Sequence, residues 1–177
     1  VVASVPPEGY NQTRVQYLRE AAMIELLRTR RSIRKYEKRL VGSEAIAILE
    51  EALLRCPSSR GINPWTFIFV DDPELLAKLS LAKDRGSAFL KEAPLAVVIC
   101  GDSGKSDVWV EDCSIAAIVA HLVAHSLGLG SCWIQIRQRA HSPAKTAAEY
   151  VREVLHIPDH LMVEAIVIMG HPGEKKE

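Results

Sequence analysis

The stretch LLRTRRSIRKYEKRL, residues 26–40, concentrates seven lysines and arginines against one acid, Glu37. Guanidinium groups bind phosphate through paired hydrogen bonds, and a serine hydroxyl beside them adds a further donor. The Arg-Arg-Ser sequence at 30–32, followed by Arg34, is therefore suited to hold one phosphate. A solvated basic helix end is the alternative, since cations favour a helix C-terminus.

A nucleic-acid surface is the third interpretation of this stretch, and the composition argues against it. The chain of 177 residues carries 22 basic and 22 acidic side chains, so its net charge is zero. A protein that coats nucleic acid needs further basic residues or stacking aromatics, and only Tyr36 lies close in sequence. The hydrophobic content of 48% is that of a globular protein, and the length suits one domain.

A second sequence that could bind phosphate is Gly104-Lys105-Ser106, which follows a predicted strand and precedes a predicted helix. A phosphate-binding P-loop needs another glycine five residues before Gly104, where this chain has Ile99. Without that glycine the backbone cannot wrap around the phosphates. We therefore interpret this segment as a polar loop.

His121 and His125 stand four residues apart, as metal-binding histidine pairs on one helix face do. Leu122 occupies the position where the metalloprotease motif has glutamate, and no carboxylate or cysteine is spaced to complete a ligand set. We expect structural histidines and no metal site. Cys132 has no histidine base positioned beside it, so packing is favoured over a nucleophilic role.

The spacing of the cysteines and the length of the apolar runs indicate the cellular compartment of the protein. Cys56, Cys100, Cys113 and Cys132 are widely spaced and form no CxxC pair. This spacing is neither that of a zinc site nor that of a disulfide framework, so it predicts a reducing, cytoplasmic environment. No apolar run reaches the roughly 18 residues that span a bilayer, and we expect no membrane association.

The hydrophobic pattern around these residues predicts alternating helices and strands in an α/β or α+β layered domain. The predicted strands are 65–70, 93–100, 130–136 and 162–170, and the predicted helices are 13–30, 43–56, 71–82, 108–127 and 142–155. Ser43 and Asp72 are expected as N-caps, with Pro73 in a first turn and Gly128 after a helix end. Residues 1–12 are expected to form an arm, and residues 13–177 a single domain.

Four segments of this chain occur in a recognisable order. They are RRSIRKY at 30–36, PSSRGINPWTFIFVDD at 57–72, LGLGSCWIQ at 127–135 and AIVIMGHPGEKK at 165–176. Together they resemble the nitroreductase family of flavin enzymes, over essentially the whole chain from about Met23. The resemblance implies an α+β fold of the three-layer α/β/α type, with a mixed, mostly antiparallel sheet flanked by helices.

The resemblance also implies a cofactor and its ligands, namely FMN at the interface of an intertwined homodimer. Arg30, Arg31, Ser32 and Arg34 would hold the phosphate and the polar ribityl and pyrimidine edge. Pro57, Ser58 and Ser59 would come from the other subunit. Trp133, Ile134 and Gln135 would lie along the isoalloxazine ring, largely through their backbone. Lys175 or Lys176 would approach the phosphate.

The implied activity is that of an FMN-dependent oxidoreductase. It would pass electrons from NAD(P)H through flavin N5 to a small acceptor such as a nitroaromatic or a quinone. This chemistry needs no acid–base side chain, so we predict no catalytic side chain. The resemblance selects neither NADH nor NADPH, and dehalogenation, azoline oxidation and flavin degradation stay compatible with it.

Three departures from the family pattern keep other functions open. Gly61 stands where many relatives carry asparagine, and Asn63 where many carry glutamine. The segment 82–92 is short, which implies a reduced lid over the flavin. A flavin-fold binding protein with little or no turnover is therefore one alternative. A nucleic-acid or phosphoprotein module using residues 28–39 is another, and its affinity would fall steeply with salt.

Overall fold

The computed structural model describes residues 22–176, which fall in two compact units, 22–30 and 31–176. The first unit contains helix α2 (Ala22–Thr29), in which Glu25 pairs with Arg28 and also accepts, at its carbonyl, from the Thr29 hydroxyl. The C-terminal end of the predicted helix 13–30 is thus confirmed. Its earlier part and the predicted arm lie outside the described residues.

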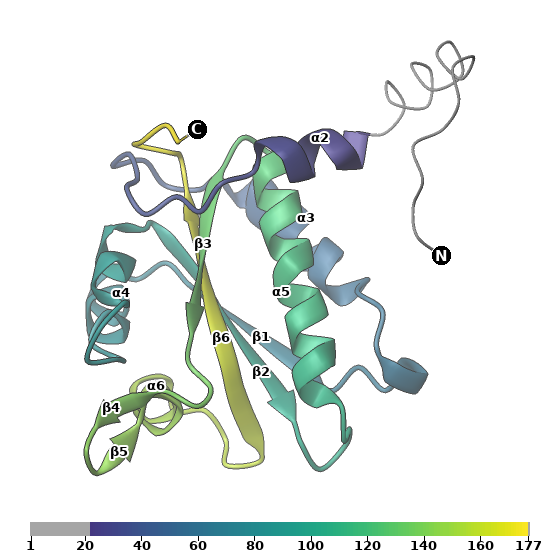
Figure 1. Ribbon diagram of the computed structural model, residues 1–177, viewed down its shortest axis with the longest axis vertical. Coiled ribbons are helices and arrows are strands. Elements are labelled where there is room, and N and C mark those ends of the chain that lie inside the picture. Colours follow the sequence, from purple (N-terminus) through teal and green to yellow (C-terminus); the bar gives the residue numbers. More distant parts are fainter. Residues whose placement is uncertain (1–21, 177) are drawn as a thin grey trace, which may run out of the picture. The chain divides into compact units, whose positions relative to one another are not determined.

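The second unit is built on a four-stranded sheet in the order β1-β2-β6-β3, with every neighbouring pair antiparallel (Figure 1). The strands are β1 (Trp65–Val70), β2 (Leu95–Asp102), β3 (Gly130–Gln135) and β6 (Leu161–Gly170). All four predicted strands are confirmed, because their runs of β-branched and aromatic residues favour extended structure. The order leaves β1 and β3 at the edges, while β2 is buried along its whole length.

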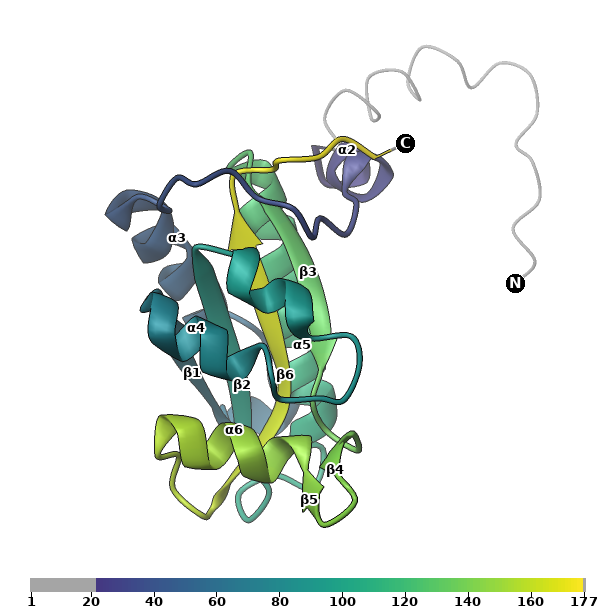
Figure 2. The same cartoon turned by 90° about the vertical axis from the view of Figure 1, so that its left-hand side faces the viewer.

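Helices cover both faces of this sheet. One face packs against α3 (Ser43–Leu54) and α5 (Trp109–Ser126). The other packs against α4 (Pro73–Leu79), the short 3₁₀ helix η2 (Ala88–Glu92) and α6 (Ala147–Leu155). Figure 2 shows α4 and α6 in front of the sheet and α5 behind it. The unit therefore has the three layers and the antiparallel sheet that the sequence predicts.

Gly128 follows the end of α5, a helix 18 residues long, as predicted. The backbone of Gly128 has φ +75°, a conformation that glycine adopts without steric cost. Its N–H donates to the His125 carbonyl at 3.0 Å, and the Leu129 N–H donates to the Ala124 carbonyl at 2.8 Å. These two bonds form a Schellman motif, which directs the chain into β3. Within residues 22–176, no helix is both long and apolar enough to cross a membrane.

The starts of α3 and α4 differ in how well the sequence predicts them. Asp72 caps α4 as predicted, since its carboxylate accepts from the Glu74 N–H at 2.8 Å and Pro73 is the first helical residue. Ser43, by contrast, is not the N-cap of α3. It is the first residue of the helix, and Gly42 occupies the cap position without a side-chain hydrogen bond.

The helix predicted over 142–155 begins later than expected, at Ala147. A two-residue turn joins two short strands before it, β4 (Ala140–Ser142) and β5 (Lys145–Thr146). Thr146 and Glu149 form a capping box, in which each side chain bonds to the other residue's backbone N–H. This box sets the start of α6 and leaves the preceding residues free to pair as strands.

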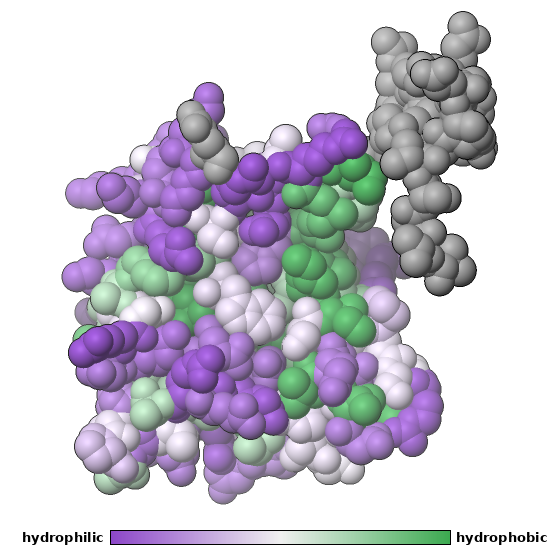
Figure 3. All heavy atoms as spheres, in the orientation of Figure 1, coloured by the Kyte–Doolittle hydropathy of each residue, from purple (hydrophilic) through white to green (hydrophobic). Residues whose placement is uncertain are grey.

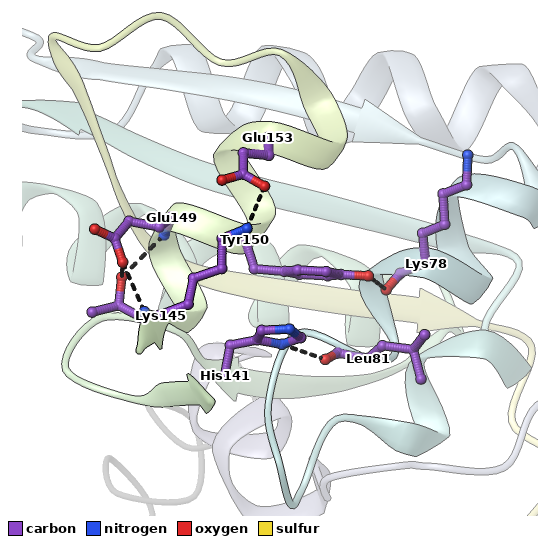
Figure 4. A network of polar contacts seen from close by, with 8 residues as sticks. Lys78, Leu81, His141, Lys145, Glu149, Tyr150 and Glu153 are labelled. Carbon is purple, nitrogen blue, oxygen red and sulfur yellow. Dashed lines mark hydrogen bonds and ion pairs between the residues drawn. The ribbon is translucent and has the colours of Figure 1, made fainter. Parts of the chain in front are cut away.

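A cluster of polar and aromatic side chains joins this hairpin and α6 to the end of α4 (Figure 4). The rings of His141 and Tyr150 stack at 4.1 Å between centroids. His141 Nδ1 donates to the Leu81 carbonyl at 3.0 Å, and the Tyr150 hydroxyl donates to the Lys78 carbonyl, also at 3.0 Å. These contacts hold one end of the α4–α6 layer together.

Candidate functional site

Of the predicted phosphate-binding residues, Arg31, Ser32 and Arg34 lie on an extended segment, 31–37, that is bonded to the start of β3. Ser32 forms a parallel bridge with Ser131, and the Ile33 N–H donates to the Ser131 carbonyl at 2.9 Å. The buried Ile33 packs directly on Gly130, where an added Cβ would lie 2.7 Å from the Ile33 Cβ. Only glycine at position 130 lets the segment approach β3 this closely.

The residues that follow β6 bond to the same segment. Gly173 donates its N–H to the Lys35 carbonyl at 2.9 Å. The Glu174 carboxylate accepts from the backbone N–H groups of Arg34, at 2.7 Å, and Lys35, at 3.3 Å. The bond from the Arg34 N–H is the main cause that lowers the pKa of Glu174. The segment is therefore held between β3 and the residues that follow β6.

One of the two C-terminal lysines contacts this segment directly. Lys176 Nζ donates to the Ser32 carbonyl at 2.8 Å and lies 3.2 Å from a Glu174 carboxylate oxygen. Lys175 is exposed, and no contact of its side chain is found within residues 22–176. Of the two predicted alternatives, Lys176 is thus the residue placed beside Ser32, with its charge partly balanced by Glu174.

Two of the predicted arginines extend from this segment. Arg31 and Arg34 are both exposed, and the Arg34 guanidinium lies 5.4 Å from the centre of the Phe89 ring. A groove of about 830 Å³ adjoins Arg34, and its lining residues are Arg34, Lys35, Tyr36, Ala88, Phe89, Glu92, Gly173, Glu174 and Lys176. Arg30 is the last residue of the first unit, where its N–H donates to the Leu26 carbonyl at 2.9 Å.

The outer edge of β3 presents backbone groups beyond the bridge to Ser32. In a strand, the N–H and C=O of one residue point to the same side, and the side alternates along the chain. Because the Ser131 carbonyl points outward to Ile33, the backbone groups of Trp133 and Gln135 point outward as well. Within the described part of the chain, no backbone group pairs with these two residues on that side.

The side chains along β3 are held by one another and by the core. Ile134 is buried. The Trp133 indole N–H donates to Gln135 Oε1 at 3.0 Å, and Gln135 Nε2 donates to the Arg137 carbonyl at 3.1 Å. The predicted triplet Trp133, Ile134 and Gln135 thus lies on an ordered strand with an open backbone edge.

The predicted loop with Pro57, Ser58 and Ser59 is closed on itself and on α5. Hydrogen bonds join the Ser58 hydroxyl to the Asn63 side-chain oxygen at 2.7 Å and to the Asn63 N–H at 2.9 Å. The Ser59 N–H donates to the Asp112 carboxylate at 2.8 Å. The side chain of Asn63, which departs from the family pattern, is therefore engaged within its own loop.

This loop and the segment 31–34 do not meet within one chain. The loop is bonded to the first turn of α5, whereas the segment is bonded to Ser131, which follows the other end of that helix. A helix of 18 residues is about 27 Å long. Figure 1 shows the loop near the lower end of α5 and the start of β3 near the upper end. One chain therefore brings together only part of the predicted set.

Asp112 is a structural residue of this loop that the sequence interpretation does not identify. Its side chain is buried, and it accepts hydrogen bonds from the Ser59 N–H and from the Ser106 hydroxyl at 3.2 Å. The signal in the sequence is weak, because an acidic residue in the first turn of a helix is ordinary. Its burial becomes visible only in the fold.

The histidine pair, the Gly104 loop and the cysteines are engaged in the fold or buried in it. His121 is buried and hydrogen-bonded to the Ser131 hydroxyl at 2.7 Å. No group of three potential metal ligands occurs among residues 22–176. Gly104 donates its N–H to Asp102 at 2.9 Å in a polar turn after β2. All four cysteines, Cys132 included, are buried, and none of them forms a disulfide.

The geometry thus defines a three-layer α+β protein in which a basic segment is bonded to an edge strand of the sheet. A family model described as the nitroreductase family matches residues 27–83 and 81–171, most of the chain. The chain belongs to the nitroreductase family. The predicted family and the predicted fold class are both confirmed.

Individual relatives agree with this membership. A solved structure titled "FMN-dependent Nitroreductase" from Clostridium difficile R20291 is 48% identical and superposes with a TM-score of 0.86, over 88% of this chain and 90% of that one. A protein of Methanothermobacter thermautotrophicus named "Putative NADH dehydrogenase/NAD(P)H nitroreductase" is 37% identical over 86% of this chain and 78% of its own length. A Bacillus subtilis "FMN reductase [NAD(P)H]" is 25% identical over 86% of this chain and 67% of its own length.

Proposed function

We propose that this chain is an NAD(P)H-dependent flavin oxidoreductase that holds FMN along the segment 31–34 and the outer edge of β3. It would pass electrons through flavin N5 to a small acceptor such as a nitroaromatic or a quinone. The observation that carries the proposal is the bridge between Ser32 and Ser131, because it makes a basic segment continuous with a row of outward backbone groups. The similar proteins named for FMN and NAD(P)H support the same cofactor and the same electron donor.

The residues of the site fit the two ends of FMN chemically. Arg31, Ser32 and Arg34 offer the charge-assisted donors that a phosphate and its polar chain require, and Lys176 adds a cation beside them. Lys175 remains the predicted alternative to Lys176. At the other end, the outward N–H groups of Trp133 and Gln135 suit the polar rim of a flat ring, while Ile134, the third residue of the predicted triplet, anchors this part of β3 in the core.

The protein's own part in the reaction is binding, orientation and electrostatics. When bound, FMN supplies hydride transfer at N5. The N–H groups along β3 are fixed by the sheet, so they stabilise negative charge that develops against them without reorganising. No acid–base side chain is assigned, and the chain's contribution is to hold one face of the ring open to donor and acceptor in turn.

The proposal includes a homodimer in which Pro57, Ser58 and Ser59 of one chain complete the site of the other. The separation of this loop from the segment 31–34 within one chain supports it. A second support is α5, whose exposed side includes Ile115 and Ile118, at 38% and 43% exposure. Figure 3 shows an apolar band over this helix. A helix that is apolar on all sides is normally covered on all sides.

Two further parts of the proposal rest on the sequence. We assign residues 13–177 to one FMN-binding domain, and we propose a cytoplasmic location because none of the cysteines forms a disulfide. Neither nucleic acid nor membrane is proposed as a partner.

A turnover assay tests the proposed activity. In oxygen-free buffer, the purified protein with FMN should oxidise more than one equivalent of NADH or NADPH only when a nitroaromatic or a quinone is present, and the rate should be measured for each donor in turn. FMN binding without turnover for either donor would instead support the binding-protein alternative. The observation that favours that alternative is the Asn63 side chain, which is turned into its own loop.

A further inference from the structure

Strand β6 contains an irregularity opposite the end of β3. Its pairing with β2 runs from Ile99 opposite Ala165 to Cys100 opposite Val163, so Glu164 is an extra residue in the ladder. Such a β-bulge redirects the side chain that it carries, and bulges are common beside functional sites. Here the redirected side chain is a carboxylate.

The backbone of the bulge terminates β3. The Glu164 carbonyl accepts hydrogen bonds from two successive N–H groups, that of Ile136 at 3.3 Å and that of Arg137 at 2.9 Å. Because one carbonyl receives both, the regular pairing of β3 with β6 stops at Gln135. Gln135, the last residue of β3 with outward backbone groups, is therefore next to the bulge in sequence register.

The Glu164 side chain is 4% exposed, which is unusual for a carboxylate. The Arg137 Nε lies 3.9 Å from its Oε2, which has no hydrogen-bond partner within residues 22–176. Burial raises the pKa of Glu164, while the Gln135 side chain and the Arg137 charge oppose that shift. A buried charge of this kind is costly unless it is paired.

A line of side-chain contacts joins this carboxylate to the middle of β3. It runs from the Glu164 carboxylate to Arg137, whose Nε lies 3.9 Å away, and Gln135 Nε2 donates to the Arg137 carbonyl at 3.1 Å. Gln135 Oε1 in turn accepts from the Trp133 indole N–H at 3.0 Å. Both ends of the Gln135 amide are therefore engaged, and its orientation depends on Arg137, which the carboxylate holds.

We propose that Glu164 is a positioning residue for the flavin side of the site. It holds Gln135 and the end of β3, so that the outward backbone groups of Trp133 and Gln135 keep their alignment. This inference rests on the proposed FMN function and adds to it a residue that itself touches no ligand. The physical reason for a carboxylate is that an apolar residue would leave the Arg137 guanidinium without this charge partner.

The test is FMN titration of the apo-protein, read by flavin fluorescence, together with the visible circular dichroism of the bound flavin. Glu164→Met fills the same space without the carboxyl, and it should weaken FMN binding roughly tenfold and change the dichroism. Glu164→Gln keeps a hydrogen-bonding group, and its FMN affinity should stay within about threefold of that of the unsubstituted protein.

Gln135→Leu should reproduce the Glu164→Met effect, and the double variant should lose no more FMN affinity than either single variant. Asp102→Asn, which alters another buried carboxylate, 8% exposed at the end of β2, serves as the control and should bind normally.

The outcomes separate this inference from the proposed function. An unsubstituted protein that binds no FMN contradicts the proposed function. If it binds FMN but Glu164→Met binds equally well, or if the losses of Glu164→Met and Gln135→Leu add fully, the positioning role is wrong and the function stands. Should Glu164→Met fail to fold, Gln135→Leu decides alone, since a normal dichroism in that variant also overturns the inference.

Discussion

At the scale of single residues, side-chain type indicates a chemistry but does not report the contacts that support it. Arg31, Ser32 and Arg34 could be selected from sequence as candidate phosphate ligands because guanidinium groups beside a hydroxyl suit a phosphate. Asp112 could not, because its burial depends on how α5 meets a distant loop. Glu164 did leave a signal, namely one acid within the apolar run LMVEAIVIMG, but only the bulge in β6 explains it.

The raised pKa of Glu164 gives a prediction about stability and pH. When a carboxyl has a higher pKa in the folded than in the unfolded protein, the folded form binds more protons between the two values. The free energy of unfolding then falls as pH rises through the window above the ordinary value of 4.5. Glu164→Gln has no such group, so it should become more stable relative to the unsubstituted protein as pH rises.

Denaturant unfolding of both proteins at about pH 4 and about pH 8 would measure this difference. The groups that face Glu164 are Gln135, Arg137 and Glu111, and none of them is changed by the substitution. The quantity to compare is the unfolding free energy of Glu164→Gln minus that of the unsubstituted protein. If this difference is the same at both pH values, or if it falls as pH rises, burial does not dominate the titration of Glu164.

At the scale of elements, every predicted strand was correct, while helix starts were predicted unevenly. The run of β-branched residues that makes a strand is local, and so is the Asp72-Pro73 start of α4. The start of α6 was misplaced because its capping box, Thr146 with Glu149, begins several residues after the first helix-compatible residue. The approach of the segment 31–37 to β3 joins residues about a hundred positions apart, so no local pattern reports it.

The contact between Gly130 and Ile33 gives a prediction for that element. A Cβ at position 130 would lie 2.7 Å from the Ile33 Cβ, so Gly130→Ala must push the segment 31–37 away from β3. Overpacking of this kind costs about 1–3 kcal/mol. We expect the variant to unfold at lower denaturant concentration and to bind FMN more weakly.

Gly42→Ser is the matched control, since nothing lies within 4 Å of an added Cβ at that position and serine is favoured at a helix N-cap. Its stability and FMN affinity should equal or exceed those of the unsubstituted protein. Equal FMN affinity in Gly130→Ala and Gly42→Ser would mean that the close approach to β3 does not contribute to the site.

At the scale of the whole molecule, the sequence order of the motifs indicated the family, but it could not show which residues one chain brings together. The structure separates the Pro57–Ser59 loop from the segment 31–34 by the length of α5. The pairing order β1-β2-β6-β3 likewise follows from long-range contacts, and it alone reveals that β3 has an open edge.

The proposed dimer predicts that a charge on the exposed side of α5 separates the subunits. Ile118→Glu places a carboxylate in the apolar band, so the protein should become monomeric and lose FMN together with the partner's loop. Light scattering coupled to size-exclusion chromatography gives the mass, and absorbance gives the flavin content. Met162→Glu changes a residue of similar exposure, 38% against 43%, elsewhere on the surface and should remain dimeric. A dimeric, flavin-containing Ile118→Glu would exclude this face as the interface.

The most direct test of the central claim is the visible absorption spectrum of the protein after incubation with FMN and removal of the excess. We expect the protein to show flavin bands that are retained in Lys38→Ala/Arg39→Ala and lost in Arg31→Ala/Ser32→Ala. Both double variants alter the same basic stretch, but only the second alters the segment that is bridged to β3. A protein without flavin bands, or equal bands in the two variants, would contradict an FMN site built on that segment.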